Sequence, residues 1–421
     1  MSESRRSGAW GEAYQALGEE LGRWIHNAIR RNEPIPFQGG HDECNYTQVW
    51  PAYSAITGDE QPMQFCRALR DQLLAWPELY HGFYPNADWD IEHSVENWTV
   101  FMRAMAEADP GDEVTARGIE DLVHHLGNWA DGCPAWFDWD RRRFVSEYVG
   151  TRAVKDLPPY DFSTYWDARA AELALAYYDL RGDERYLQFC VAFAGGWADH
   201  ILAQEGLGYW LMLDAGTADR DGFKAAYGEY PEDFHARNIG WAQEIMAHML
   251  HVHARVPDQS LLDAARKIAT IGPEAVARFR GEEVSTTPWR RTYQAEGGDQ
   301  VFADEIAAAE RELVSEATAA LELPLPDILM LEGTGHYPVR LHGWRDEAGV
   351  VREHTGPSPS QMWEAFRLSG EERLAVRAME LVARQLKLAA STLRDGREHG
   401  CNGRFVHGAA HEAMRVFEKA G

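Results

Sequence analysis

The chain has 421 residues, 45% of them hydrophobic, and a formal net charge of −26. A surface this acidic argues against a nucleic-acid-binding protein, because contact with phosphates requires clustered basic residues. No run approaches the roughly 18 apolar residues of a membrane span, and residues 1–10 lack the apolar region of a secretory signal. We therefore expect a cytoplasmic protein that binds neither nucleic acid nor membrane.

A turn signal recurs along the chain, and each copy separates two helical patterns. In every copy a helix ends at Gly or Pro, an acidic residue follows, and a new amphipathic helix begins. Gly tolerates the left-handed conformation at a helix C-terminus, and Asp or Glu accepts the free N–H groups of the next helix. Each copy therefore predicts a tight αα-hairpin. The copies begin at Ile56, Ala108, Leu180, Arg255 and Leu368.

The two helices of each predicted hairpin differ in composition. The first is rich in aromatic, Ala and Met residues around most of its circumference, which indicates packing on two sides. The second carries more charge on one face, as an outer helix does. The first helices correspond to residues 49–56, 96–108, 170–180, 240–252 and 361–368.

Longer segments join one hairpin to the next, at 132–160, 205–230, 281–297 and 323–356. Short turns at one end and long segments at the other predict an all-α fold, an (α/α)6-type toroid of six or seven hairpins. We expect one catalytic domain over 1–421. A helix near 301–321 fits neither ring, and residues 337–344 and 350–355 predict one short β-hairpin.

Polar residues gather where the first helices begin, and in a toroid those ends face one shared cavity. Aromatic residues alternate with them, and flat aromatic faces beside hydrogen-bonding groups are typical of sugar sites. The predicted site contains His41, Trp89, Asp90, Glu92, His93, Asn97, Tyr165, Trp166, Asp167, His235, Arg237, Asn238, Arg291, Tyr293 and His407.

These residue types suit β-elimination from a uronic-acid-containing glycan. The reaction needs a group that neutralises the carboxylate, a base for the C5 proton and an acid for the leaving oxygen. We predict His235 as the base, with His93 as the second candidate, and Tyr293 as the acid, with Tyr165 as a further proton-transfer residue. Asn97 and Arg237 are predicted to bind the carboxylate, with Asn238 and Arg291 available for the same task.

Three other functions fit parts of the pattern. A glycoside hydrolase would use two carboxylates, drawn from Asp42, Asp90, Glu92 and Asp167. A sugar epimerase would use paired histidines, and a binding module would use the same fold without chemistry. A terpene-type enzyme is disfavoured, because the motifs DDxxD and DxDD are absent.

We expect no cofactor. Asp90 and His93, with His41 or Asp42, form an alternative divalent-metal site that we do not favour, and His407 and His411 lack an HExxH context. The expected partner is an oligo- or polysaccharide substrate. The oligomeric state stays open, a homodimer included.

Two short segments resemble known α/α-barrel carbohydrate enzymes. Residues 234–250, FHARNIGWAQEIMAHML, are similar to a helix of the N-acylglucosamine and cellobiose 2-epimerases, with His235 opening it. The residues Asn45–Tyr46 and Arg290–Tyr293 resemble the content of toroid polysaccharide lyases. The resemblance implies the toroid architecture and a carbohydrate substrate, and it assigns no residue role.

Overall fold

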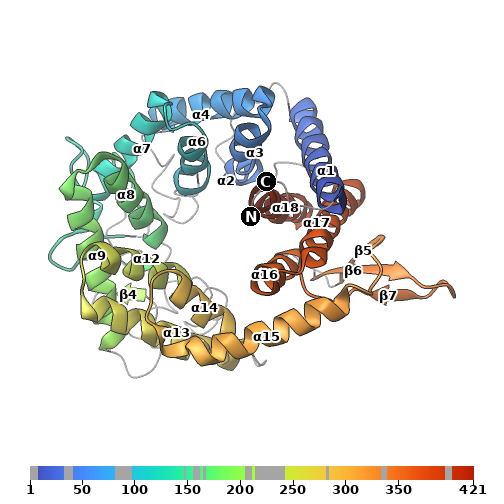
Figure 1. The fold of residues 1–421 in the computed structure, drawn as a ribbon. Coiled ribbons are helices and arrows are strands. Elements are labelled where there is room, and N and C mark those ends of the chain that lie inside the picture. Colours follow the sequence, from blue (N-terminus) through green and yellow to red (C-terminus); the bar gives the residue numbers. More distant parts are fainter. Residues whose placement is uncertain are drawn as a thin grey trace. The chain divides into compact units, whose positions relative to one another are not determined.

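The computed structural model describes residues 8–32, 41–80, 97–146, 148–154, 162–164, 167–203, 211–213, 242–280, 284–332, 339–393 and 401–421. Most of these residues are helical, which confirms the predicted all-α class (Figure 1). The chain divides into two compact units, and α4, α6 and α15 each contribute residues to both. Unit 1 comprises residues 1–69, 107–109 and 307–421, and unit 2 comprises residues 70–106 and 110–306.

Unit 1 is built from helices and one small sheet. Its longest helices, α1 and α17, pack together, and α18 packs against both of them. The elements are α1 (Gly8–Asn32), α2 (His41–Thr47), α3 (Trp50–Thr57), the first half of α4 (Glu60–Tyr80), most of α15 (Ala303–Ala320), β5 (Ile328–Glu332), β6 (Val339–Arg345), β7 (Val351–Glu353), α16 (Pro359–Ser369), α17 (Glu372–Thr392) and α18 (Cys401–Ala420).

Unit 2 is built from helices that pack around α12, with two short pairs of strands. Helix α12 lies between α8 and α14 and also packs against α9 and α13 (Figure 1). The elements are the π-helical η2 (Asn97–Met102), α6 (Arg103–Ala108), α7 (Glu113–Leu126), β1 (Phe137–Asp138), β2 (Arg143–Phe144), β3 (Phe162–Thr164), α8 (Ala168–Arg181), α9 (Glu184–Leu202), β4 (Leu211–Leu213), α12 (Ala242–Arg255), α13 (Gln259–Arg280), α14 (Thr287–Ala295) and η5 (Gln300–Phe302).

The five predicted hairpin turns are present. Three of them end a helix at Gly58, Gly182 or Gly370, whose φ angles of 73°, 72° and 74° lie in the left-handed region. In each case the glycine N–H donates to the carbonyl oxygen four residues earlier. This bond satisfies a carbonyl group in the last turn of the helix that would otherwise lack a hydrogen-bond partner. The turn residue is therefore dictated by backbone geometry.

Acidic caps start the second helix at four of the five turns. Asp59, Asp112, Asp183 and Asp258 each accept a backbone N–H from the first turn of the following helix. Glu371 makes no such bond at the start of α17. The predicted capping is thus confirmed for the aspartates and wrong for the glutamate, whose longer side chain does not close the short ring that a cap requires.

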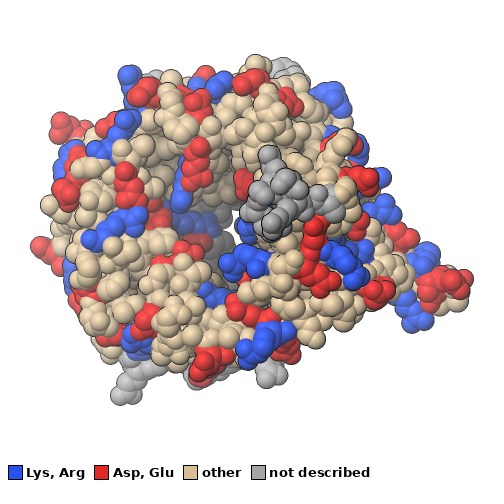
Figure 2. Space-filling model, viewed as in Figure 1, with Lys and Arg blue, Asp and Glu red and all other residues tan. Residues whose placement is uncertain are grey.

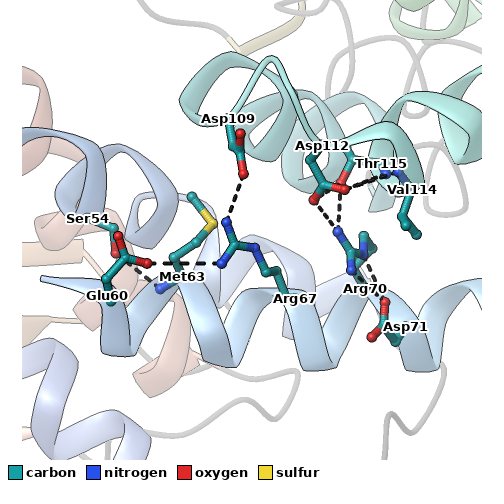
Figure 3. Close-up of polar contacts among 10 residues, drawn as sticks. All are labelled: Ser54, Glu60, Met63, Arg67, Arg70, Asp71, Asp109, Asp112, Val114 and Thr115. Atoms are coloured by element: carbon teal, nitrogen blue, oxygen red, sulfur yellow. Dashed lines mark hydrogen bonds and ion pairs between the residues drawn. The ribbon is translucent and has the colours of Figure 1, made fainter. Parts of the chain in front are cut away.

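Helix α4 carries two arginines that bind different aspartates (Figure 3). Arg67 is 39% exposed and donates to Asp109 at 2.8 Å. Arg70 is almost fully buried, pairs with Asp112 and donates to the hydroxyl of Thr115 at 3.2 Å. Because Asp112 also caps α7, Arg70 fixes the start of α7 against α4.

Aromatic side chains fill the core of each unit. In unit 1, Trp24, Tyr46 and Trp50 meet edge to face, with ring centroids 5.4 to 6.1 Å apart. In unit 2, Phe189 contacts Phe137 in the same manner, at 4.9 Å. Such pairs add to the free energy gained by burying the rings.

The predicted β-hairpin is confirmed, because β6 pairs antiparallel with β7. The prediction of a single hairpin was nevertheless too sparse. Strand β5 adds to the same sheet, and β1–β2 and β3–β4 form two further antiparallel pairs. The segment 281–297 is also not a continuous loop, since it contains α14, and the helix expected near 301–321 is α15.

No helix among the described residues is long and apolar enough to cross a membrane. On the face seen in Figure 2, Asp and Glu side chains are scattered among uncharged residues, with Lys and Arg between them.

Candidate functional site

Helices α8 and α12 are joined by a row of polar contacts. Near the start of both helices, Arg169 donates two hydrogen bonds to Glu244 from Nε and Nη2, at 2.9 and 3.0 Å. Near their ends, Arg255 Nε donates to Asp179 at 2.9 Å. Residue numbers rise in the same direction along both helices, so α8 and α12 run parallel and begin at the same end.

Between these two ion pairs lies a group of four titratable residues, Glu172, His248, His251 and Glu296, which we call the Glu172 cluster. Glu172 of α8 binds two histidines of α12, with His248 Nδ1 at 2.6 Å and His251 Nδ1 at 3.0 Å. The second nitrogen of His251, Nε2, lies 2.7 Å from Glu296, which directly follows α14. One imidazole therefore bridges two carboxylates from different elements.

This arrangement makes His251 a cation at neutral pH. Hydrogen bonding to Glu172 is the main cause, and together with Glu296 it raises the pKa of His251 to about 9. Burial acts to raise the pKa of Glu172, but hydrogen bonds and charge from His248 and His251 hold it well below its usual range. The side chains of His251 and Glu296 are 31% and 39% exposed, so solvent reaches both.

His248 has a different environment. Its ring is fully buried, Nε2 has no hydrogen-bond partner, and the ring packs 5.7 Å from that of Phe193 on α9. A group enclosed in this way cannot meet a substrate. It can orient the Glu172 carboxylate toward His251.

Two further polar contacts involve α12 and the residue that precedes α8. The hydroxyl of Thr292 on α14 donates to the side-chain oxygen of Gln243 on α12, at 3.2 Å. Immediately before α8, the hydroxyl of Ser163 donates to Asp167 at 2.6 Å, and both side chains are buried. Asp167 was predicted as a substrate-binding carboxylate, and here it holds β3 against the start of α8.

Tyr293, the predicted acid, is fully buried on α14. Its hydroxyl donates to Asp299 at 3.1 Å, and Arg266 pairs with the same carboxylate. Burial raises the pKa of Tyr293. The acid role of Tyr293 stays a prediction, but its hydroxyl lies on a fully buried side chain, whereas the His251 side chain is 31% exposed.

Arg291, predicted to bind a carboxylate, also lies on α14. Its side chain is partly buried, and its Nε atom is buried without a hydrogen-bond partner. The role of Arg291 in binding a carboxylate stays a prediction.

The structure describes only the backbone of three predicted site residues, Asn97, His41 and His407. They lie in η2, α2 and α18, and their side chains fall outside the description. The remaining predicted site residues lie outside the described residues altogether. These are Trp89, Asp90, Glu92, His93, Tyr165, Trp166, His235, Arg237 and Asn238.

The sequence did carry a signal for the Glu172 cluster. His248 and His251 stand three residues apart in an otherwise apolar helix, and Glu172 is a single carboxylate in the run AAELALAYY. Residues at that spacing share a helix face. The apolar surroundings, however, favour packing positions for these residues.

Within the described ranges, no three His, Cys, Asp or Glu side chains are placed to hold a metal ion together. The alternative metal ligands Asp90 and His93 lie outside those ranges. Comparison with family models, with curated proteins and with solved structures found no match.

Proposed function

We propose that this chain is a carbohydrate-active enzyme that cleaves a uronic-acid-containing glycan by β-elimination. The supporting observation is the His251 imidazolium, held through both nitrogens by Glu172 and Glu296 and partly open to solvent. A histidine whose pKa is tuned by carboxylates at a partly exposed position is typical of general acid–base catalysis.

The proposal includes the finer architecture. Five αα-hairpins, with the first helices α8 and α12 parallel, suit an (α/α)6-type toroid that forms one catalytic domain. The proposal also includes a cytoplasmic location. Closure by six or by seven hairpins stays a prediction.

Each residue in the proposed reaction has one task. A base, His235 or His93, takes the C5 proton of the uronate, and Asn97 and Arg237 neutralise its carboxylate. His251 gives its Nε2 proton to the leaving oxygen as the C4–O bond breaks and the C4–C5 double bond forms. The oxygen takes the position of Glu296 at Nε2, while Glu172 and His248 hold the ring in place.

Within the Glu172 cluster, histidine chemistry fits the geometry better than hydrolysis by a carboxylate pair. A hydrolase needs two carboxylates that face each other across the scissile bond. In the Glu172 cluster and its flanking pair, Glu172, Glu244 and Glu296 are each bound to a histidine or an arginine. Hydrolysis and epimerisation would each give a product different from that of β-elimination, so an activity test distinguishes the three.

The test is to incubate the protein with a panel of uronate and neutral glycans. New absorbance at the ultraviolet edge marks the unsaturated product of a lyase. Reducing ends without that absorbance mark a hydrolase, and an isomerised sugar without cleavage marks an epimerase. Absence of any product from all glycans would contradict a catalytic role.

A further inference from the structure

A pocket of about 390 Å³ lies in unit 1 beside the first turns of α17. It is separate from the Glu172 cluster, which belongs to unit 2. Apolar groups from α1, from α17 and from the residue after α15 form part of its wall, and charged residues of α17 form the rest. The lining consists of Ala9, Leu321, Glu372, Arg373, Val376, Arg377 and Glu380.

Arg377 is the unusual member of this lining. The residue is nine-tenths buried, although arginine is normally exposed unless it is paired. One amino group donates to the carbonyl oxygen of Leu323, the other lies 3.8 Å from Glu380, and Nε has no hydrogen-bond partner. Desolvation lowers its pKa. The guanidinium has therefore lost water without gaining a close carboxylate in return.

Arg373 lies one turn earlier on the same helix face. Its side chain is 66% exposed, and it stands 3.6 Å from both Glu322 and Glu371, beyond hydrogen-bonding distance. Two guanidinium groups thus line one pocket, and neither makes a hydrogen bond to a carboxylate. Glu372 and Glu380 also belong to the lining, and the 43% exposure of Glu380 allows solvent to screen its repulsion.

We propose that this pocket binds a small oxyanion, a carboxylate or a phosphate, between Arg373 and Arg377. The planar guanidinium matches either group through paired N–H donors, and the Arg377 amino group that lies 3.8 Å from Glu380, beyond hydrogen-bonding distance, supplies one of them. The apolar wall from Ala9, Leu321 and Val376 accommodates the carbon part of the ligand.

The test is calorimetric titration of the full chain with inorganic phosphate and, separately, with succinate, at constant ionic strength. Saturable binding of phosphate alone identifies a phosphate site, and binding of succinate alone identifies a carboxylate site. Binding of both supports a general oxyanion site. If neither binds, the proposal is overturned.

Variants locate the binding. Arg373→Ala should weaken it about tenfold, since a charge-assisted hydrogen bond is lost. Arg377→Lys keeps the charge but removes the planar donors, and it should weaken binding by a similar factor. Arg415→Ala removes the same charge from an exposed position on α18 and should leave affinity unchanged. Equal affinity in Arg373→Ala and the wild type would place the anion elsewhere and refute the site, even if Arg377→Lys fails to fold.

Discussion

His251 links the packing of α8, α12 and the end of α14 to pH. Its pKa is about 9 in the folded protein against 6.5 for the free side chain. A raised pKa contributes stability that is fully present below the unfolded value and is lost as the pH rises through the folded value. The Glu172 cluster should therefore stabilise unit 2 most near pH 6 and least above about pH 9.

The first prediction is that His251→Gln removes this pH dependence. Between about pH 6 and about pH 9.5, the wild type should lose on the order of 2 kcal/mol of unfolding free energy more than the variant does. Urea denaturation at the two pH values measures the difference. His253→Gln, on the same helix, bonds only to the backbone at Asp258 and serves as the control. Identical pH profiles for the wild type and His251→Gln would contradict the assigned pKa.

The second prediction compares the two arginines of α4. Arg70→Met leaves the nearly buried Asp112 carboxylate without its partner, which should cost about 3 kcal/mol of stability. Arg67→Met removes a pair that is partly exposed to solvent, and it should cost less than about 1 kcal/mol. Denaturant unfolding of the two variants gives the comparison. Equal losses would show that burial does not determine the contribution of these pairs.

At the scale of the elements, the hairpins could be predicted because each depends on a few adjacent residues. Gly182 and Asp183 end one helix and start the next within two positions. Helix α14 was missed, because Ser285, Thr286 and Pro288 resemble a loop. A proline in the first turn is also a signal for a helix start, and it could have found the element.

The Glu172 cluster could not be predicted from spacing alone. Glu172 and His251 are 79 residues apart in sequence, and their contact depends on the parallel packing of α8 and α12. Periodicity identifies the face that a residue occupies, but not the helix that this face meets. The pair of Tyr293 and Asp299 is local by comparison, and its contact depends on the turn that follows α14.

The third prediction tests the hairpin geometry. Gly182→Ala should destabilise the protein by about 1–2 kcal/mol, because alanine disfavours a φ of 72°. Gly11→Ala is the matched control, since this exposed glycine lies within α1 and an added methyl group would meet nothing. That change should stabilise by about 0.5–1 kcal/mol. Thermal denaturation distinguishes the two, and a loss in both variants would contradict the turn argument.

At the scale of the whole molecule, the net charge of −26 affects how an anionic glycan approaches. Long-range repulsion between two anions weakens as salt screens it. The fourth prediction is that the apparent KM for a polyuronate falls several-fold between about 10 mM and about 200 mM NaCl. The KM for a neutral glycan should stay constant. An increase in KM for the polyuronate with salt would instead indicate a locally basic binding surface.

The most direct test is the rate of uronate glycan cleavage by the wild type, His251→Gln and His253→Gln, followed by ultraviolet absorbance from neutral pH to above pH 9. We predict a wild-type rate that declines as His251 loses its proton near pH 9, an unchanged rate in His253→Gln, and a rate in His251→Gln that is lower by about 100-fold or more. Wild-type activity in a folded His251→Gln variant would contradict the proposed acid and, with it, the assignment of the site.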